Sequence, residues 1–277
     1  MSALTRRIHG LCGRRLCGMC GKNRNGTGAC HEARLRRWPG IRGTKYRLPV
    51  NMLSRPVSSN QTSIHPDLER RVVRHQQYSY EKPIASHSQR QFSLLQHLLG
   101  SDPDGLILDS GCGTGESTRL LAQVYPDQRV IGVDRSAHRL ARYTGKEEYL
   151  VDKNLILIRM DLVDLWRLLL RAGIRIDAHF LFYPNPWPLK KHLQRRWHGH
   201  PVFPDMLKLS PQLELRTNWH IYQQEFSLAT RILGYHTEDT EPKDSPAVSP
   251  FETKYRHSGH ALYCTVMTSC PLDCPVL

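Results

Sequence analysis

Three glycines at alternating positions, preceded by a carboxylate, form the pattern in this sequence that most directly predicts ligand binding. Gly111, Gly113 and Gly115 follow an apolar run that leads into Asp109, and a stretch of helical character begins at Glu116. Glycine permits positive φ and lets the main chain approach a ligand closely. The N-terminus of the following helix offers free N–H groups. The order predicts a strand, a tight turn and a helix, with a ligand beside the turn.

The spacing of the glycines and a second carboxylate narrow the class of ligand. Gly-x-Gly-x-Gly differs from a phosphate-binding loop and from the dinucleotide pattern Gly-x-Gly-x-x-Gly. Asp109 would repel a pyrophosphate, but it suits the amino and sulfonium groups of S-adenosylmethionine. Asp134 ends the next apolar run, about 20 residues after Gly115, where an acid at a strand end can bind a ribose diol. The two carboxylates therefore predict a nucleoside-type cofactor that carries positive charge.

Apolar runs of strand length alternate with helical stretches, which predicts an α/β fold with a doubly wound, mostly parallel, Rossmann-like sheet. The predicted strands cover residues 106–108, 130–133, 154–160, 176–183, 213–216 and 261–267. Helices are predicted from His65, around 92–99, over 116–124, through Leu140, and over 162–170 and 222–233. Residues 238–250 are expected to form a loop, and the basic run 190–196 is expected on a helix.

Polar residues stand at the ends of the predicted strands, namely Asp109, Asp134, Asp161, Asn185 and Thr217. The carboxyl ends of parallel strands meet at one edge of a sheet, where open α/β sheets bind their ligands. We therefore expect these five side chains to converge on one crevice.

Most of the net charge of +14 lies in the first 60 residues, in which Glu32 is the only acid. Residues 1–51 lack periodicity and are rich in Arg, Gly and Cys, which predicts a disordered basic arm before a domain at 52–277. The arm could bind nucleic acid, serve as an organelle presequence or lie upstream of a true start at Met52. We favour the last interpretation because ordinary composition begins just after Met52.

The cysteines do not predict a metal site or disulfides. Cys17 and Cys20 have zinc-knuckle spacing, and Cys12, Cys30 and His31 could be further ligands, but the second pair is irregular. No apolar run is long enough to span a membrane or to form a signal-peptide core. We expect a cytoplasmic protein with reduced thiols.

The segments after the fourth and fifth predicted strands are the most specific part of the sequence. Pro184-Asn185-Pro186-Trp187-Pro188-Leu189-Lys190-Lys191-His192 is followed by Arg195-Arg196, then by Thr217-Asn218-Trp219 and by Thr253-Lys254-Tyr255-Arg256. In this order, over roughly residues 64–267, the chain resembles the tRNA (guanine-N7) methyltransferase family. That family has Pro-Asp-Pro-Trp-Pro-Lys-Lys-Arg-His with Lys-Arg-Arg, Thr-Asp-Trp and Thr-Lys-Phe-Glu at the corresponding places.

The resemblance implies a class I methyltransferase that uses S-adenosylmethionine and acts on tRNA or a similar structured RNA. The sequence does not decide the oligomeric state, and a monomer or weak dimer is expected. The cofactor would contact Asp109, Gly111, Gly113, Gly115, Asp134, Asp161 and Leu162. Catalysis would involve Asn185 and Asn218. The substrate would contact Lys190, Lys191, His192, Arg195, Arg196, Thr217 and Thr253, and the phosphate track could extend to Arg70, Arg71, Arg74 and Arg90.

Three acidic positions of the family are occupied here by Asn185, Asn218 and Arg256, and a lysine by Leu189. Guanine N7 has an in-plane lone pair and attacks a methyl sulfonium without losing a proton, so positioning matters more than a base. Methylation leaves the ring cationic, and carboxylates would stabilise that charge. An amide can accept hydrogen bonds from the guanine edge but does little for the charge.

Two alternatives remain open on the sequence. The Asn185-Pro186 dipeptide is similar to the start of the Asn-Pro-Pro-aromatic motif of amino-group methyltransferases, although the order that follows differs. The missing acids also fit a binding module that retains cofactor or RNA affinity and has lost turnover. Detection of a methylated nucleoside in RNA would separate an enzyme from such a module.

Overall fold

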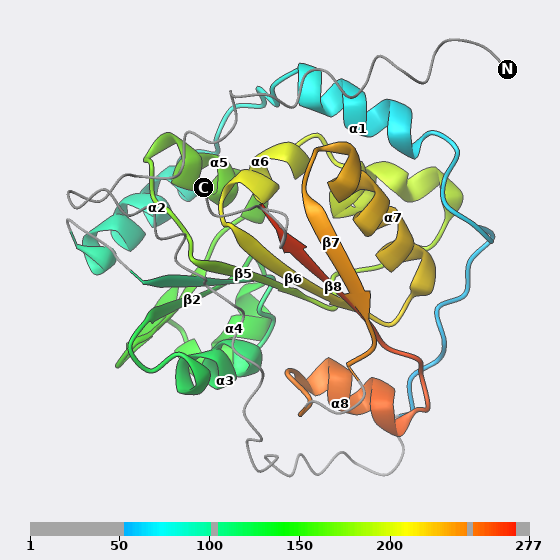
Figure 1. Cartoon of the computed structure of the whole chain (residues 1–277). Coiled ribbons are helices and arrows are strands. Elements are labelled where there is room, and N and C mark those ends of the chain that lie inside the picture. Colours follow the sequence, from blue (N-terminus) through cyan, green and yellow to red (C-terminus); the bar gives the residue numbers. More distant parts are fainter. Residues whose placement is uncertain (1–52, 101–104, 243–245, 270–277) are drawn as a thin grey trace, which may run out of the picture. The chain divides into compact units, whose positions relative to one another are not determined.

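The computed structural model describes residues 53–100, 105–242 and 246–269, which include one eight-stranded sheet with helices on both faces (Figure 1). The order across the sheet is β3-β4-β2-β1-β5-β6-β8-β7. The strands are β1 Leu106–Ser110, β2 Arg129–Asp134, β3 Tyr149–Asp152, β4 Leu155–Arg159, β5 Ala178–Phe182, β6 Gln212–Thr217, β7 His236–Thr240 and β8 Tyr263–Thr268. Four pairings between β4, β2, β1, β5 and β6 are parallel, while β3 and β8 run antiparallel to their neighbours. The predicted doubly wound, mostly parallel sheet is confirmed.

Helices cover both faces of this sheet and create two layers of core. They are α1 Leu68–Gln77, α2 Ser86–Leu99, α3 Glu116–Val124, α4 Ala137–Thr144, α5 Leu162–Arg171, α6 Phe203–Lys208, α7 His220–Ile232 and α8 Pro250–His257, with 3₁₀ helices η1 Lys190–Arg195 and η2 Trp197–Gly199. Leu108 of β1 shares a core with α1, α2, α5, α6 and α7. Its neighbour Ile107 packs with Leu121 of α3 on the other face, because successive side chains of a strand point to opposite faces.

Strand β1 is buried along its whole length, which explains why its sequence is a continuous apolar run rather than an alternating one. The helices that follow the central strands begin almost at once. Asp161 Oδ1 accepts a hydrogen bond from Val163 N at 2.9 Å and caps α5. Ser136 Oγ accepts one from Arg139 N at 3.3 Å and caps α4. These caps place the helix N-termini at the same edge as the strand ends.

The predicted elements of the central sheet are confirmed, but the structure contains elements that the sequence analysis did not predict. Strand β3, helix α6 and helix α8 were absent from the prediction. The predicted bounds of the loop at 238–250 are wrong at both ends, because β7 continues to Thr240 and α8 begins at Pro250. β7 is a mostly exposed edge strand of polar residues, so its pairing with β8 determines its structure rather than its own composition. The basic run 190–196 lies largely on η1, a 3₁₀ helix.

Several predictions fall on residues outside the described ranges. They are the basic arm at residues 1–51, the start at Met52, and the weighed zinc ligands Cys12, Cys17, Cys20, Cys30 and His31. Within the described ranges, no helix is both long and apolar enough to cross a membrane. In the same part of the chain, no cluster of three or more metal-ligating side chains occurs.

Candidate functional site

The turn after β1 has the backbone geometry that its glycines predict. Gly111, Gly113 and Gly115 have φ of +77°, +62° and +87°, a region that side chains disfavour. A Cβ on Gly115 would also lie 2.7 Å from Leu157 Cδ1, so packing excludes any larger residue there. A Cβ on Gly113 would meet no atom within 4 Å. The main chain at Gly113 is therefore open to a ligand, whereas Gly115 is closed by the core.

Asp109 presents a buried carboxylate oxygen behind this turn. Its Oδ2 accepts hydrogen bonds from the hydroxyls of Ser117 and Thr118 at 2.6 and 2.7 Å, whereas the buried Oδ1 has no partner. Burial raises the pKa of Asp109 to about 6; the two hydroxyls oppose this shift and the charge of Asp134 adds to it. A buried carboxylate with a free oxygen is suited to a cationic group, and this arrangement fits S-adenosylmethionine.

Glu116 is a second buried carboxylate beside the turn, and the sequence analysis treated it only as a helix start. One of its oxygens lies 3.2 Å from Arg142 Nη1, and the other is buried without a partner. An acid directly after the third glycine was the available signal.

Asp134 ties the end of β2 to the glycine turn. Its Oδ2 accepts a hydrogen bond from Gly113 N at 3.0 Å and lies 3.3 Å from Arg139 Nη1. Its Oδ1 accepts one from Ser136 N at 2.7 Å. These contacts fix the position of the Asp134 carboxylate at the end of β2. Binding of the ribose diol by Asp134 stays a prediction.

Asp161 and Leu162, at the start of α5, are the remaining predicted cofactor residues, and Leu162 lies near the glycine turn. Asp161 caps α5 through Val163 N, and the Leu162 side chain would be 3.9 Å from a Cβ on Gly111. The predicted cofactor residues on β1, β2 and the start of α5 are thus brought together by contacts through Gly111 and Gly113. Their individual contacts with the cofactor stay predictions.

Asn185 lies in a strained loop that follows β5. Tyr183 and Trp187, on either side of it, have φ of +51° and +44°, which is unusual for bulky residues and costs about 1–3 kcal/mol each. Asn185 is exposed, and its Oδ1 accepts a hydrogen bond from Trp187 N at 3.2 Å. The turn therefore uses the amide oxygen to stabilise its own backbone and leaves the amide nitrogen toward solvent.

Asn218 follows β6, next to the strand that carries the Asn185 loop. Its Nδ2 lies 3.2 Å from Nδ1 of His260. The hydroxyl of Thr217 accepts a hydrogen bond from Trp219 N at 3.2 Å, and that of Thr253 donates one to Ser249 O at 3.3 Å. Both threonines are buried and serve the local backbone. Their predicted contact with the substrate stays a prediction.

The basic run after the Asn185 loop divides into exposed and buried cations. Lys190, Lys191 and Arg195 are exposed, and the Arg195 guanidinium lies 4.7 Å from the centre of the Trp187 ring. His192 meets the same ring edge-on at 5.7 Å. An exposed cation stacked on an aromatic ring can bind RNA phosphates and bases.

The prediction that Arg196 contacts the substrate is wrong. It is completely buried, and its Nη1 lies 2.5 Å from Glu225 Oε2 on α7. Its other nitrogens donate hydrogen bonds to Trp187 O and Leu189 O, both at 3.2 Å, and to Gln61 Oε1 at 3.0 Å. A guanidinium enclosed in this way holds the Asn185 loop rather than a ligand.

Glu225, like Glu116, is a buried acid near the site that was not predicted from the sequence. It accepts hydrogen bonds from Gln61 Nε2 and His65 N and lies 2.9 Å from His198 Nε2, in addition to Arg196. It lies beside Tyr222 and Phe226, on the buried side of α7. A charged residue inside an apolar helical stripe was the available signal, because such a residue needs a buried partner.

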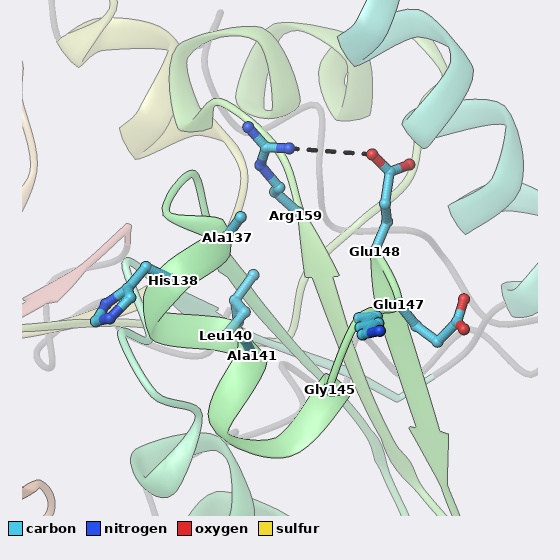
Figure 2. A pocket seen from close by; sticks show the side chains of 9 residues that line it. Ala137, His138, Leu140, Ala141, Gly145, Glu147, Glu148 and Arg159 are labelled. Carbon is cyan, nitrogen blue, oxygen red and sulfur yellow. Dashed lines mark ion pairs between the residues drawn. The ribbon is translucent and has the colours of Figure 1, made fainter.

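A surface pocket of about 430 Å³ lies next to this site, between α4 and the hairpin of β3 and β4 (Figure 2). Its rim includes the ion pair of Arg159 and Glu148, drawn as a dashed line, with a separation of 4.0 Å. None of the predicted site residues lines this pocket. Its lining contains charges of both signs, Lys146 and Arg159 with Glu147 and Glu148, so it does not resemble an anion or cation site.

The sheet order, with a glycine turn after β1 and a carboxylate near the end of both β1 and β2, is that of a class I, S-adenosylmethionine-dependent methyltransferase. Residues 104–265 match the family model Methyltransf_4, described as "Putative methyltransferase", and the chain belongs to this family. A protein of Leifsonia xyli subsp. xyli is 26% identical over 170 residues, covering 56% of this chain and 72% of that protein. A protein of Nitrosococcus oceani is 29% identical over 170 residues, covering 57% and 68%. Both are named tRNA (guanine-N(7)-)-methyltransferase, and the resemblance inferred from the motifs is confirmed.

The first prediction concerns the charge on Asp109. Because the pKa of this carboxyl is raised to about 6, its ionised form predominates only above that pH. We expect the affinity for S-adenosylmethionine to fall as the pH drops through 6, approaching about tenfold per pH unit below it. Calorimetric titration across this range measures the slope. Asp109→Asn should bind weakly with no such slope, and an unchanged slope in this variant would place the titrating group elsewhere.

The second prediction concerns Asp134. Asp134→Ala removes the acceptor predicted for the ribose hydroxyls and the acceptor that holds Gly113 N. We expect weaker cofactor binding by about 1.5–3 kcal/mol, the range for hydrogen bonds to a charged group. Calorimetry measures the loss, and Asp152→Ala, at the exposed end of β3, is the control. Equal affinities in the two variants would contradict the placement of the ribose.

The third prediction concerns Glu225. Burial disfavours its charge, but His198, Arg196 and Gln61 outweigh burial and lower its pKa from 4.5 to about 2. Its stabilising contribution should be complete above about pH 4.5 and be lost as the pH falls toward 2. Glu225→Gln should lower the free energy of unfolding at neutral pH by about 3–5 kcal/mol and reduce this acid dependence. Denaturant unfolding at several pH values tests this, with Glu238→Gln on exposed β7 as the control. The same dependence of the unfolding free energy on pH in Glu225→Gln and in the wild type would contradict the prediction.

Proposed function

We propose that this protein transfers the methyl group of S-adenosylmethionine to N7 of a guanine in tRNA. The observation that carries this proposal is the convergence of three segments at the carboxyl edge of one sheet. The glycine turn follows β1, the Asn185 loop follows β5 and the Asn218 turn follows the adjacent β6. The family match and the names of the relatives support the same reaction. A cytoplasmic location and a monomeric or weakly dimeric state stay predictions.

The cofactor would supply an electrophilic methyl group on a positively charged sulfur. In this proposal Asp109 attracts the positive charge of the cofactor, Asp134 binds its ribose, and the open main chain at Gly113 lets it approach. No residue needs to remove a proton, because the N7 lone pair is free in guanine. The role of the protein is then to align the lone pair with the methyl group and to keep water from the contact.

The substrate would be held by groups outside the crevice. Lys190, Lys191 and Arg195 are exposed directly after the Asn185 loop and can neutralise phosphates of a structured RNA. Trp187 lies under Arg195, so the same element combines a cation with an aromatic face. These features support RNA as the substrate class over a small molecule.

The amino-group alternative at Asn185 needs the amide oxygen as an acceptor for the attacking NH₂, and one of its two lone pairs is already used by Trp187 N. We rank this alternative below guanine N7 because the order Asn-Pro-Trp-Pro differs from the Asn-Pro-Pro-aromatic motif. A binding module without turnover is the second candidate function, because Asn185, Asn218 and Arg256 replace three acids of the family. Binding of both S-adenosylmethionine and tRNA without any methylated product would favour this candidate.

The fourth prediction restores the missing acids. If guanine N7 is the target, the double variant Asn185→Asp, Asn218→Asp should transfer methyl faster by about tenfold or more, because carboxylates stabilise the cationic ring that forms. The double variant Asn185→Ala, Asn218→Ala removes the amides without adding charge and should be slower than the wild type. The measurement is single-turnover methyl transfer from labelled cofactor to tRNA, with chain scission at the product base to identify 7-methylguanine.

The outcome that contradicts the guanine-N7 proposal is also specific. Slower transfer by the aspartate variant, with no 7-methylguanine from either this variant or the wild type, would show that the amides serve a different acceptor atom. Nucleoside analysis of total RNA would then identify that atom.

A further inference from the structure

His260 determines which atom of the Asn218 amide points toward its ring. Its Nε2 lies 3.0 Å from Ser54 O, and its Nδ1 lies 3.2 Å from the terminal amide of Asn218. A carbonyl oxygen only accepts hydrogen bonds, so Nε2 must carry the proton, and Nδ1 of the neutral ring is then an acceptor. The amide group beside Nδ1 must therefore be the NH₂ group. Oδ1 of Asn218 is directed away from His260.

Stacked aromatic rings hold His260 in this position. The ring lies parallel to Tyr255, with centroids 5.3 Å apart and an angle of 15° between the planes. Tyr255 also contacts Tyr183 at 5.4 Å, and Tyr183 is the residue with positive φ that leads into the Asn185 loop. The stack fixes the plane of the imidazole. A 180° flip of the ring would keep this plane but would break the contacts of Nε2 with Ser54 O and of Nδ1 with Asn218, so these two contacts fix the orientation of the ring within the plane.

The Asn218 oxygen that points away from His260 has no donor in the described part of the chain. Asn218 is only half-buried at the end of β6. A guanine presents two adjacent donors, N1–H and the N2 amino group, whereas adenine presents an acceptor at N1. A fixed amide oxygen favours guanine, and a reversed amide would present its NH₂ group and lose this preference.

We propose that His260 is a positioning residue that fixes the Asn218 amide with Oδ1 toward the N1 and N2 edge of the target guanine. The inference rests on the proposed guanine methylation and names a specificity determinant for it. His260 does not touch the reacting atoms. It acts by excluding the reversed orientation of the amide.

Two variants separate the roles of the two ring nitrogens. His260→Gln keeps a polar atom near Nε2 and the bond to Ser54 O, but it loses the acceptor at Nδ1. His260→Asn keeps a polar atom at Nδ1 that can accept from Asn218. Both variants lose the stacking on Tyr255, so a difference between them reports the acceptor rather than the ring.

The activity measurement uses tRNA with either guanine or inosine at the methylated position, because inosine lacks the N2 amino group. Wild type should prefer guanine by up to about tenfold in single-turnover rate, the value of one hydrogen bond. In His260→Gln this ratio should fall toward one, while His260→Asn should retain most of it. A ratio in His260→Gln equal to that of wild type would overturn the proposal.

A second measurement does not depend on turnover. Nitrogen NMR of ¹⁵N-histidine-labelled protein in mildly alkaline buffer should show His260 protonated at Nε2, with an Nδ1 resonance that moves in Asn218→Ala. A proton on Nδ1 would mean that the amide oxygen faces the ring, and this result overturns the proposal. Absence of 7-methylguanine from the wild type would refute the proposed function, and the tautomer would still decide the orientation of Asn218.

Discussion

The ion pair between Arg196 and Glu225 is the interaction on which the geometry of the candidate site depends. Both side chains are fully buried, and removing each charge from water costs several kcal/mol. Other groups offset this cost by completing the hydrogen bonds of the pair. Glu225 accepts hydrogen bonds from Gln61 and His65. Arg196 donates to the carbonyl oxygens of Trp187 and Leu189, in the loop that contains Asn185. The guanidinium also covers the Trp219 ring at 4.8 Å. One buried cation thus holds the loop after β5 and the turn after β6.

This anchor explains how the Asn185 loop keeps an unfavourable backbone. Positive φ at Tyr183 and Trp187 persists only where surrounding contacts outweigh the strain. The Trp187 carbonyl accepts a hydrogen bond from the buried Arg196, and the exposed Arg195 guanidinium lies over the Trp187 ring. The two adjacent arginines therefore have opposite roles: one is a structural cation in the core, and the other is available to RNA. The loop is positioned before any substrate arrives, which reduces the entropy lost on binding.

The sequence was sufficient for the central sheet because parallel strands that are buried on both faces appear as continuous apolar runs. The glycine turn could also be predicted from the sequence, because the positive φ at Gly111, Gly113 and Gly115 favours glycine at these positions. The edge strands β3 and β7 were missed for different reasons: β7 is polar throughout, and β3 has only four residues, too few for a periodic signal. In both cases pairing with a neighbouring strand decides the structure. Arg196 was misassigned for a related reason. Its partner Glu225 is 29 residues away, and only tertiary structure shows that the two charges meet.

The charges around the C-terminal motif show how the chain accommodates the loss of the family's acids. Arg256 stands where the family has a glutamate, but its guanidinium lies 2.6 Å from Glu252 one helical turn earlier. Glu252 also lies 3.1 Å from Arg216, which in turn lies 2.6 Å from Glu214. The charges of these two arginines and two glutamates balance, and Arg256 is thus paired with an acid of its own helix. If Asn185 and Asn218 contact the guanine as proposed, they offer it fixed dipoles in place of the charges that carboxylates would supply. Dipoles act only when their direction is fixed, and for this reason the contacts that orient each amide matter more here than they would for a carboxylate with two equivalent oxygens.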